Sequence, residues 1–213
     1  LDVQGGVLVD EARDVNPEWT FAIDNGRPFV TWKFAATLDG RSAAADGTSQ
    51  WITSPEARAD VHRLRAECDV ILVGTGTVLT DDPRLTVRDS TGTPLHRRFQ
   101  PLRAVMGMRP IPADAAASDD TAESLRLRTR DPGHALAMLF GHGRHRIWLE
   151  GGPTLAAAFL RAGLVDRVVA YLAPALLGDG PAAVGDLGVT TVAAAVQFDV
   201  IDVAQVGSDL RIT

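Results

Sequence analysis

The sequence predicts a three-layer α/β domain with a mixed, mostly parallel sheet and a C-terminal antiparallel hairpin. Short runs of apolar, β-forming residues alternate along most of the chain with segments whose apolar residues recur at helical spacing. The last segment instead alternates apolar and polar residues from Val196 to Val203 before a Gly207-Ser208 turn, as a hairpin does. Because 46% of the 213 residues are hydrophobic, the chain can bury one sizeable core.

Residues 1–27 are expected to form an N-terminal arm or inter-domain linker with one helical turn around residues 9–13. Three turn-forming pairs interrupt this stretch: Gly5-Gly6, Asn16-Pro17 and Asn25-Gly26. The first residue is Leu1 rather than methionine, which favours a piece of a longer polypeptide. The domain proper is expected to span residues 28–213.

From residue 28 onward, apolar runs bounded by turn residues predict the buried strands. These strands are expected at residues 29–35, 69–73, 102–106, 147–149 and 168–172, with a loop at 108–123. Helices are expected from about residue 55, at 132–140 and at 153–162. The last of these has proline at its first position and glycine just after its end, which are the usual start and stop signals.

The helix that follows Ser54 is expected to be amphipathic. The segment Thr53-Ser54-Pro55-Glu56 supplies a hydroxyl cap, an early proline and an acidic residue in the first turn. Its apolar residues at positions 57, 61, 64 and 68 fall on one face, because they are spaced by three or four. The neighbouring stripe carries Arg58, His62 and Arg65, so the helix should pack by one side and present basic groups on the other.

Charge and composition argue against several classes of function. The formal net charge is −6, which disfavours general binding to nucleic acid or membrane surfaces, because both carry phosphates. No apolar run reaches the roughly 18 residues that span a bilayer, and the N-terminal segment lacks the pattern of a signal peptide. The single cysteine, Cys68, forms no internal disulfide, and no Cys/His cluster has zinc spacing. We therefore expect no metal site and a cytoplasmic location.

The only lysine of the chain, Lys33, lies within the first expected strand, among 20 arginines elsewhere. A buried ammonium is costly unless it meets an anion or serves a function. A compact ammonium also differs from a planar guanidinium, so a lone lysine indicates a place where arginine does not serve. The alternative is a side chain that reaches solvent from the strand end.

A glycine-rich segment, Gly74-Thr75-Gly76-Thr77, follows the second expected strand. It lacks the third glycine of a dinucleotide-binding fingerprint and the Gly-Lys-Ser/Thr of a Walker loop, so both of those motifs are rejected. Glycines still permit a close approach of backbone to ligand. Asp81 could accept a hydrogen bond from an amide or supply a proton, whereas Arg84 and Arg88 could equally be solvated charges.

Two further segments lie where ligands bind in open α/β sheets, at the carboxyl ends of strands. Glu150-Gly151-Gly152-Pro153-Thr154 joins a strand to a helix start, where free backbone N–H groups suit a pyrophosphate. Glycines in such turns can also serve packing alone. In the loop at residues 47–53, Trp51 is equally consistent with a core side chain and with a ligand platform.

These segments, in this order and spacing, resemble one family. The resemblance is carried by four motifs: residues 33–41 (KFAATLDGR), 47–53 (GTSQWIT), 72–88 (LVGTGTVLTDDPRLTVR) and 149–155 (LEGGPTL). The chain resembles the reductase domain of the bifunctional riboflavin-biosynthesis deaminase/reductase (RibD/RibG) family from about residue 28 to its end. The first 20 residues resemble the linker that follows the zinc deaminase domain of that family, and the deaminase signature is missing from this chain.

The resemblance implies a dihydrofolate-reductase-like fold and an NADPH-dependent reductase. The implied reaction converts 5-amino-6-(5-phosphoribosylamino)uracil to the ribitylamino compound by hydride transfer to ribose C1′. A homodimer, preceded by a zinc deaminase domain, is the corresponding expectation for partners. Two alternatives stay open: reduction of another pterin or pyrimidine, since a fold alone does not determine function, and a non-catalytic domain attached to a deaminase.

The resemblance also implies roles for individual residues. Those implied to line the NADPH site are Ala35, Trp51, Thr77, Asp81, Gly152, Pro153, Thr154, Leu155, Ala156, Ala157 and Ala158. Those implied to hold the substrate are Lys33, Ser49, Arg65, Leu85, Arg88 and Glu150, with the arginines on its phosphate. Lys33, Asp81 and Glu150 are the expected catalytic residues. Where the family often has a polar cofactor contact, this chain has Gly107-Met108-Arg109, and we expect Arg109 to meet the NADPH 2′-phosphate unless it is merely solvated.

Overall fold

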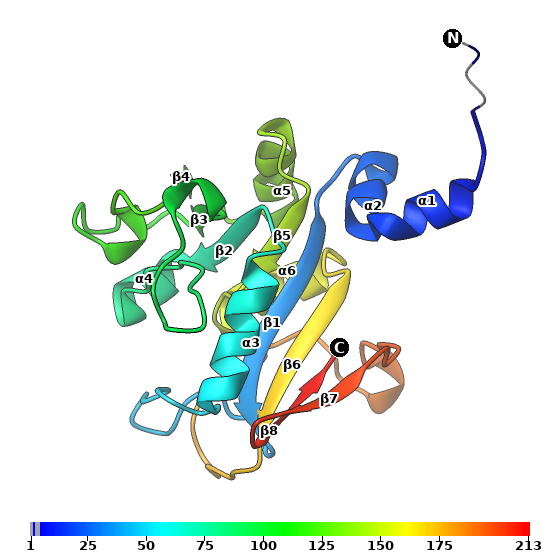
Figure 1. The fold of residues 1–213 in the computed structure, drawn as a ribbon. Helices are drawn as coiled ribbons and strands as arrows, with labels where there is room; N and C mark the ends of the chain where they lie inside the picture. The colour runs from blue at the N-terminus through cyan, green and yellow to red at the C-terminus, as the bar shows by residue number, and fades with distance from the viewer. Residues whose placement is uncertain (1, 3–4) are drawn as a thin grey trace.

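The computed structural model of the protein describes residue 2 and residues 5–213. Within them an eight-stranded sheet runs through the molecule in the order β4-β3-β2-β5-β1-β6-β8-β7 (Figure 1). Its strands are β1 (Phe29–Thr37), β2 (Val70–Gly74), β3 (Leu102–Met106), β4 (Ser124–Leu127), β5 (Arg146–Leu149), β6 (Arg167–Ala173), β7 (Val203–Val206) and β8 (Asp209–Ile212). The strands from β4 to β6 pair in parallel, whereas β8 is antiparallel to both β6 and β7. The predicted mixed sheet and C-terminal hairpin are confirmed.

Helices cover both faces of this sheet and make three layers. They are α1 (Val9–Val15), α2 (Pro17–Asn25), α3 (Pro55–Arg65), α4 (Thr75–Asp81), α5 (Pro132–Gly141) and α6 (Pro153–Arg161). On one face, Leu136 of α5 and Phe159 of α6 pack in a cluster with Leu72 and Leu149. On the other face, residues of α3 and α4 pack in a second cluster that includes Tyr171. The alternation along each strand explains this division, because successive side chains point to opposite faces.

Helix α3 forms as its sequence predicts. Ser54 caps it, since its hydroxyl accepts a hydrogen bond from the backbone N–H of Ala57 at 3.2 Å. Ala57 and Val61 are buried against the sheet, which confirms the apolar face. The helix ends at Arg65, and this places the guanidinium beside the carboxyl ends of the central strands.

The N-terminal arm has more structure than its sequence predicts. Instead of one turn it forms α1 and α2, because Pro17 stands at the first position of α2, where its fixed φ favours a helix. Helix α2 packs on the domain through the buried Ala22 and an edge-to-face contact between Phe21 and Phe29. Arg27, just after this helix, forms an ion pair with Asp166 at 2.7 Å. The linker therefore lies against the sheet from about residue 17 onward.

Two other elements of the structure, α4 and β4, were not predicted from the sequence. Helix α4 follows β2 directly, in the glycine-rich segment where no helix was expected, and β4 adds an edge strand. The short β4 carries polar residues and lacks the apolar run that marks a central strand, which explains why its sequence does not reveal it. The expected alternation at residues 196–200 produces no strand, and this stretch is exposed.

A fully buried arginine holds the long loop after β3 in place. Arg103 donates hydrogen bonds to the carboxylate of Asp119 at 2.8 Å and to the carbonyl oxygens of Ala122 at 2.6 Å and Ala116 at 3.1 Å. The backbone N–H of Ala116 in turn donates to the carboxylate of Asp82 at 2.8 Å. Arg103 thereby fixes the end of α4, one residue after Asp81.

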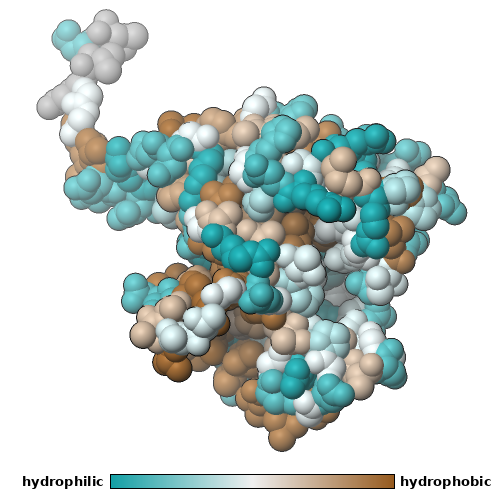
Figure 2. All heavy atoms as spheres, turned by 180° about the vertical axis from the view of Figure 1, so that it is seen from behind, coloured by the Kyte–Doolittle hydropathy of each residue, from teal (hydrophilic) through white to brown (hydrophobic). Residues whose placement is uncertain are grey.

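Exposed apolar side chains concentrate in the C-terminal part of the chain. They include Leu176, Val192, Val200 and Ile201, each more than 60% exposed. In the view from behind, hydrophobic atoms reach the surface in the lower half of the molecule (Figure 2). Among the residues that the structure describes, no helix is long and apolar enough to cross a membrane.

Candidate active site

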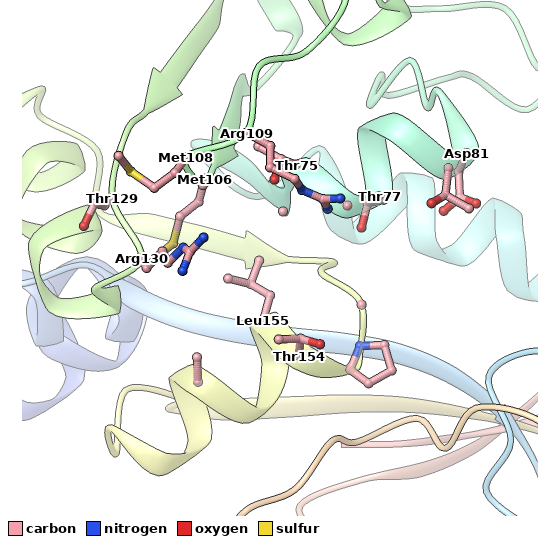
Figure 3. Close-up of a pocket in the computed structure, with 17 residues that line it drawn as sticks. Thr75, Thr77, Asp81, Met106, Met108, Arg109, Thr129, Arg130, Thr154 and Leu155 are labelled. Carbon is pink, nitrogen blue, oxygen red and sulfur yellow. The ribbon is translucent and has the colours of Figure 1, made fainter.

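A cleft of about 500 Å³ opens at the carboxyl edge of the parallel strands, between α4 and α6 (Figure 3). This is the edge at which open α/β sheets bind ligands. Its walls come from the ends of β2 and β3, from the loop after β4 and from the first turns of α4 and α6. The lining residues are Gly74, Thr75, Gly76, Thr77, Thr80, Asp81, Met106, Gly107, Met108, Arg109, Thr129, Arg130, Gly152, Pro153, Thr154, Leu155 and Ala158.

The start of α6 offers backbone amides to this cleft. Gly152 is the N-cap residue, and no side chain caps the helix. The two glycines before it have different reasons to be there. A Cβ on Gly151 would lie 2.5 Å from Cδ2 of Leu155, whereas a Cβ on Gly152 would meet nothing within 4 Å. Gly151 therefore serves packing, and Gly152 leaves space on the cleft side at a helix N-terminus suited to an anion.

Two arginines line the cleft without partners. Arg109 follows β3, and its guanidinium lies over Gly76, where a Cβ would come within 3.1 Å of it. In Figure 3 it points toward Thr77, whereas Arg130 enters from the loop after β4. Neither guanidinium donates a hydrogen bond or forms an ion pair within the described part of the chain. The sequence did not indicate Arg130 as a site residue, because β4, the strand that positions it, was not predicted.

Next to the cleft, a buried group of charges joins α3 to the end of β5. Arg65 donates to Glu150 through Nε at 2.6 Å and through a second nitrogen, and also to the carbonyl oxygen of Thr86 at 3.1 Å. The indole N–H of Trp148 donates to the same carboxylate. Burial alone would raise the pKa of Glu150, but the charge and hydrogen bonds of Arg65 outweigh it and lower the pKa to about 2. Glu150 is thus a carboxylate at neutral pH.

Lys33 faces the same group of charges from β1. Burial lowers the pKa of its ammonium; Glu150 opposes this shift, and Arg65 adds to it. The ammonium makes no hydrogen bond with any residue that the structure describes, and it lies 5.8 Å from the centre of the Tyr171 ring. Lys33 is only half-buried at this position, so its catalytic role and the solvent-reaching alternative both stay predictions.

Asp81 closes α4 and lines the cleft. Burial raises the pKa of its carboxyl, although the side chain keeps contact with solvent. It makes no side-chain hydrogen bond within the described residues, so it is available to a ligand. Thr77, on the same helix, points into the cleft one turn earlier (Figure 3).

The remaining residues expected to bind substrate lie around this centre in different ways. Arg88 donates to the carbonyl oxygen of Gly92 at 2.9 Å, and Leu85 is buried in the core, so only its backbone could meet a ligand. Ser49 is half-buried in its loop. His62 shows that Arg88 and Arg65 are near one another: burial lowers its pKa to about 4, and the positive charges of both arginines contribute. Both arginines therefore lie close enough to His62 for their charges to act on it.

Four residues expected at the cofactor lie outside the lining of the cleft. Trp51 is 68% exposed and stacks on the guanidinium of Arg58 at 4.4 Å. Ala35 lies on β1, and Ala156 and Ala157 are buried against the core. The cofactor contacts that the resemblance implies for these four residues stay predictions. The side chains of Ala156 and Ala157 point away from the cleft.

Comparisons with known proteins identify the family of the chain. The profile of the RibD C-terminal domain family matches residues 28–212. The riboflavin biosynthesis protein RibD of Mycobacterium tuberculosis (strain ATCC 25618 / H37Rv) is 49% identical over 214 residues, covering 100% of this chain and 62% of that protein. This chain therefore spans under two thirds of that relative.

Solved structures show the same fold. The Acinetobacter baumannii RibD structure, form 2, superposes with a TM-score of 0.86 at 29% identity, covering 100% of this chain and 64% of that one. A Thermotoga maritima structure superposes with a TM-score of 0.83 at 25% identity, covering 97% of this chain and 62% of that one. Its name is diaminohydroxyphosphoribosylaminopyrimidine deaminase/5-amino-6-(5-phosphoribosylamino)uracil reductase. The expected dihydrofolate-reductase-like fold is confirmed, and the chain belongs to the RibD C-terminal domain family.

Proposed function

We propose that this chain reduces 5-amino-6-(5-phosphoribosylamino)uracil to 5-amino-6-(5-phosphoribitylamino)uracil with NADPH. The observation that carries the proposal is that the charges of Lys33, Arg65 and Glu150 meet two residues before Gly152, which lines a cleft of about 500 Å³. Glu150 and Gly152 are two residues apart, so the cleft and the charges share one strand-to-helix turn. The name of the Thermotoga maritima relative supports the same substrate.

The residues of the cleft fit NADPH. The uncapped start of α6, with open space at Gly152, suits the pyrophosphate. Arg109 and Arg130 supply unpaired positive charge, and Met106, Met108 and Leu155 supply apolar surface for a base. When bound, NADPH supplies the hydride; the reaction also takes up one proton and releases NADP⁺.

The chain's own residues would then bind and orient the sugar. Both oxygens of Glu150 are held by Arg65, and a carboxylate has further lone pairs that can accept from ribose hydroxyl groups. The Lys33 ammonium can polarise the sugar oxygen or stabilise the opened, imine-like form of the substrate. Arg88, near His62, is placed to meet the substrate phosphate. Asp81 can accept a hydrogen bond from an amide or supply a proton.

The proposal is tested by following the loss of reduced-nicotinamide absorbance in the presence of NADPH and each of three compounds. We expect turnover with the phosphoribosylaminouracil, much weaker turnover with its dephosphorylated form, and none with dihydrofolate. Equal turnover of the phosphorylated and dephosphorylated compounds would remove the support for a phosphoribosyl substrate. Turnover of dihydrofolate would favour the pterin-reductase alternative, and turnover of no compound the non-catalytic one.

Replacing Gly152 with valine should weaken NADPH binding about tenfold or more while leaving the fold nearly unchanged. The φ of Gly152 is −64°, which valine adopts without strain, and its Cβ would meet no protein atom. The added methyl groups would therefore occupy only cleft space. Binding can be measured by calorimetric titration with NADPH, and thermal unfolding checks the fold. Unchanged affinity would place the pyrophosphate elsewhere.

Replacing Arg109 with alanine should lower NADPH affinity ten- to a hundredfold and leave NADH affinity nearly unchanged. A charge-assisted contact of arginine with phosphate contributes about 1.5–3 kcal/mol, and only NADPH carries the 2′-phosphate. Arg130→Ala is the matched control, because both guanidiniums line the cleft unpaired. A loss of NADPH preference in Arg130→Ala alone would assign the 2′-phosphate to that residue instead.

The proposal extends to the rest of the protein. The chain covers only 62% of its Mycobacterium tuberculosis relative, which is consistent with an upstream deaminase domain as its partner. The homodimer, the cytoplasmic location and the boundary at residue 28 belong to the same proposal and stay predictions.

A further inference from the structure

We propose that Tyr171 is a positioning residue, whose ring face holds the Lys33 ammonium at the strand ends. The two side chains lie on the same face of the sheet, because the β1–β6 register pairs Lys33 with Val169 and Ala35 with Tyr171. The Lys33 ammonium is 5.8 Å from the ring centre, which is within the range of a cation–π contact. The inference rests on the proposed function only for the role of Lys33 in the reaction.

The ring of Tyr171 cannot turn away from Lys33. Tyr171 is fully buried, and its hydroxyl donates to the carboxylate of Asp60 on α3 at 2.7 Å. Asp60 is itself held by Arg211 at 2.8 Å and by Arg63 at 2.9 Å. Burial and this hydrogen bond both raise the pKa of Tyr171, so the ring stays neutral. Packing and the hydrogen bond to Asp60 thus hold a neutral ring in one position, and the face of this ring is what the Lys33 ammonium contacts.

The ammonium needs such a surface because its other neighbours oppose one another. Glu150, after β5, attracts it, whereas Arg65, on α3, repels it, and burial disfavours its charge. Both oxygens of Glu150 are already engaged by Arg65. Glu150 favours the charged form of Lys33, but its own charge is already paired with that of Arg65. The Tyr171 ring on β6 also favours the charged form of Lys33 and makes no such pair with Arg65.

The chain offers an unusually direct test, since Lys33 is its only lysine and Tyr171 its only tyrosine. Lysine labelled with ¹³C at Cε gives a single NMR signal, and its chemical shift against pH reports the titration of Lys33 alone. The variants are Tyr171→Phe, which keeps the ring, and Tyr171→Leu and Tyr171→Met, which remove it. Two non-aromatic variants guard against one failing to fold, and Tyr171→Phe is the control for loss of the hydroxyl.

We expect the midpoint of Lys33 to fall by about one pH unit in Tyr171→Leu and Tyr171→Met and to change little in Tyr171→Phe. The alkaline limit of turnover should move down by the same amount, with the KM for NADPH unchanged, because Tyr171 does not line the cleft. An unchanged midpoint without the ring, or an equal fall in Tyr171→Phe, would overturn the inference. The NMR titration needs no turnover, so it decides the matter even if the proposed reaction fails.

Discussion

Replacing Lys33 with arginine should lower turnover of the phosphoribosylaminouracil by about a thousandfold, within the range for loss of a positioned proton donor or electrostatic stabiliser. Arginine keeps the charge, but its guanidinium is larger and planar. The Lys33 ammonium lies 5.8 Å from the centre of the Tyr171 ring and close to the charges of Arg65 and Glu150, so we expect a bulkier guanidinium to disturb these contacts. Steady-state kinetics should show the loss in kcat, with the KM for NADPH little changed.

The companion variant Lys33→Met should be inactive and yet more stable than the wild type at neutral pH. The folded-state pKa of Lys33 is lowered, so keeping its charge when buried destabilises the fold below that pKa. This cost disappears as pH rises past the ordinary value of 10.5, where the lysine is neutral in both states. Removing the ammonium should raise stability by about 1 kcal/mol, or a few degrees in Tm. Near-normal turnover of Lys33→Arg, or a less stable Lys33→Met, would make Lys33 an ordinary structural residue.

Much of the fold was predictable because its core strands and amphipathic helices carry strong local patterns. Residues 102–106 formed a strand with the expected bounds, and α3 began at the expected cap. The elements that were missed, α4 and β4, lie where local signals are weak. Helix α4 contains threonines and a glycine, which are poor helix formers, and it is held by packing of Val78 and by the loop that Arg103 fixes.

The candidate site was predictable in part for a different reason. The motif at residues 150–154 indicated an anion site, but only the structure separates Gly151, which is needed for packing, from Gly152, which leaves open space. Contacts between distant segments carry no local signal. Neither the Arg65–Glu150 pair, 85 positions apart, nor the contact of Lys33 with Tyr171 can be read from spacing, because each depends on the order of strands in the sheet.

Replacing Glu150 with glutamine should abolish most activity and lower the free energy of unfolding by about 3 kcal/mol at neutral pH. The change leaves Arg65 and Lys33 as two buried cations without an anion, and breaking a buried pair from one side typically costs 3–5 kcal/mol. The matched control is Glu67→Gln, which removes the exposed partner of Arg63 and should change stability by less than about 1 kcal/mol. Denaturant unfolding measures both.

The pH dependence of this difference tests its cause. The pKa of Glu150 is lowered to about 2 in the folded protein from an ordinary 4.5. Its stabilisation is therefore fully present above pH 4.5 and is lost as pH falls toward 2, and Glu150→Gln should lack this part of the acid transition. A difference between wild type and variant that is constant from pH 2 to 6 would mean that glutamine disturbs packing instead.

The double variant Arg65→Met with Glu150→Gln distinguishes stability from function at this site. Methionine removes the unpaired guanidinium, and glutamine still offers an oxygen to the indole N–H of Trp148. The double variant should therefore lose less stability than the sum of the two single variants, because one buried charge no longer lacks its partner. Activity should not recover, since the substrate would meet neither the carboxylate nor the guanidinium. Recovery of stability without activity would show that the Arg65–Glu150 pair is retained for the reaction, whereas additive losses of stability would mean that the two residues act independently in the fold.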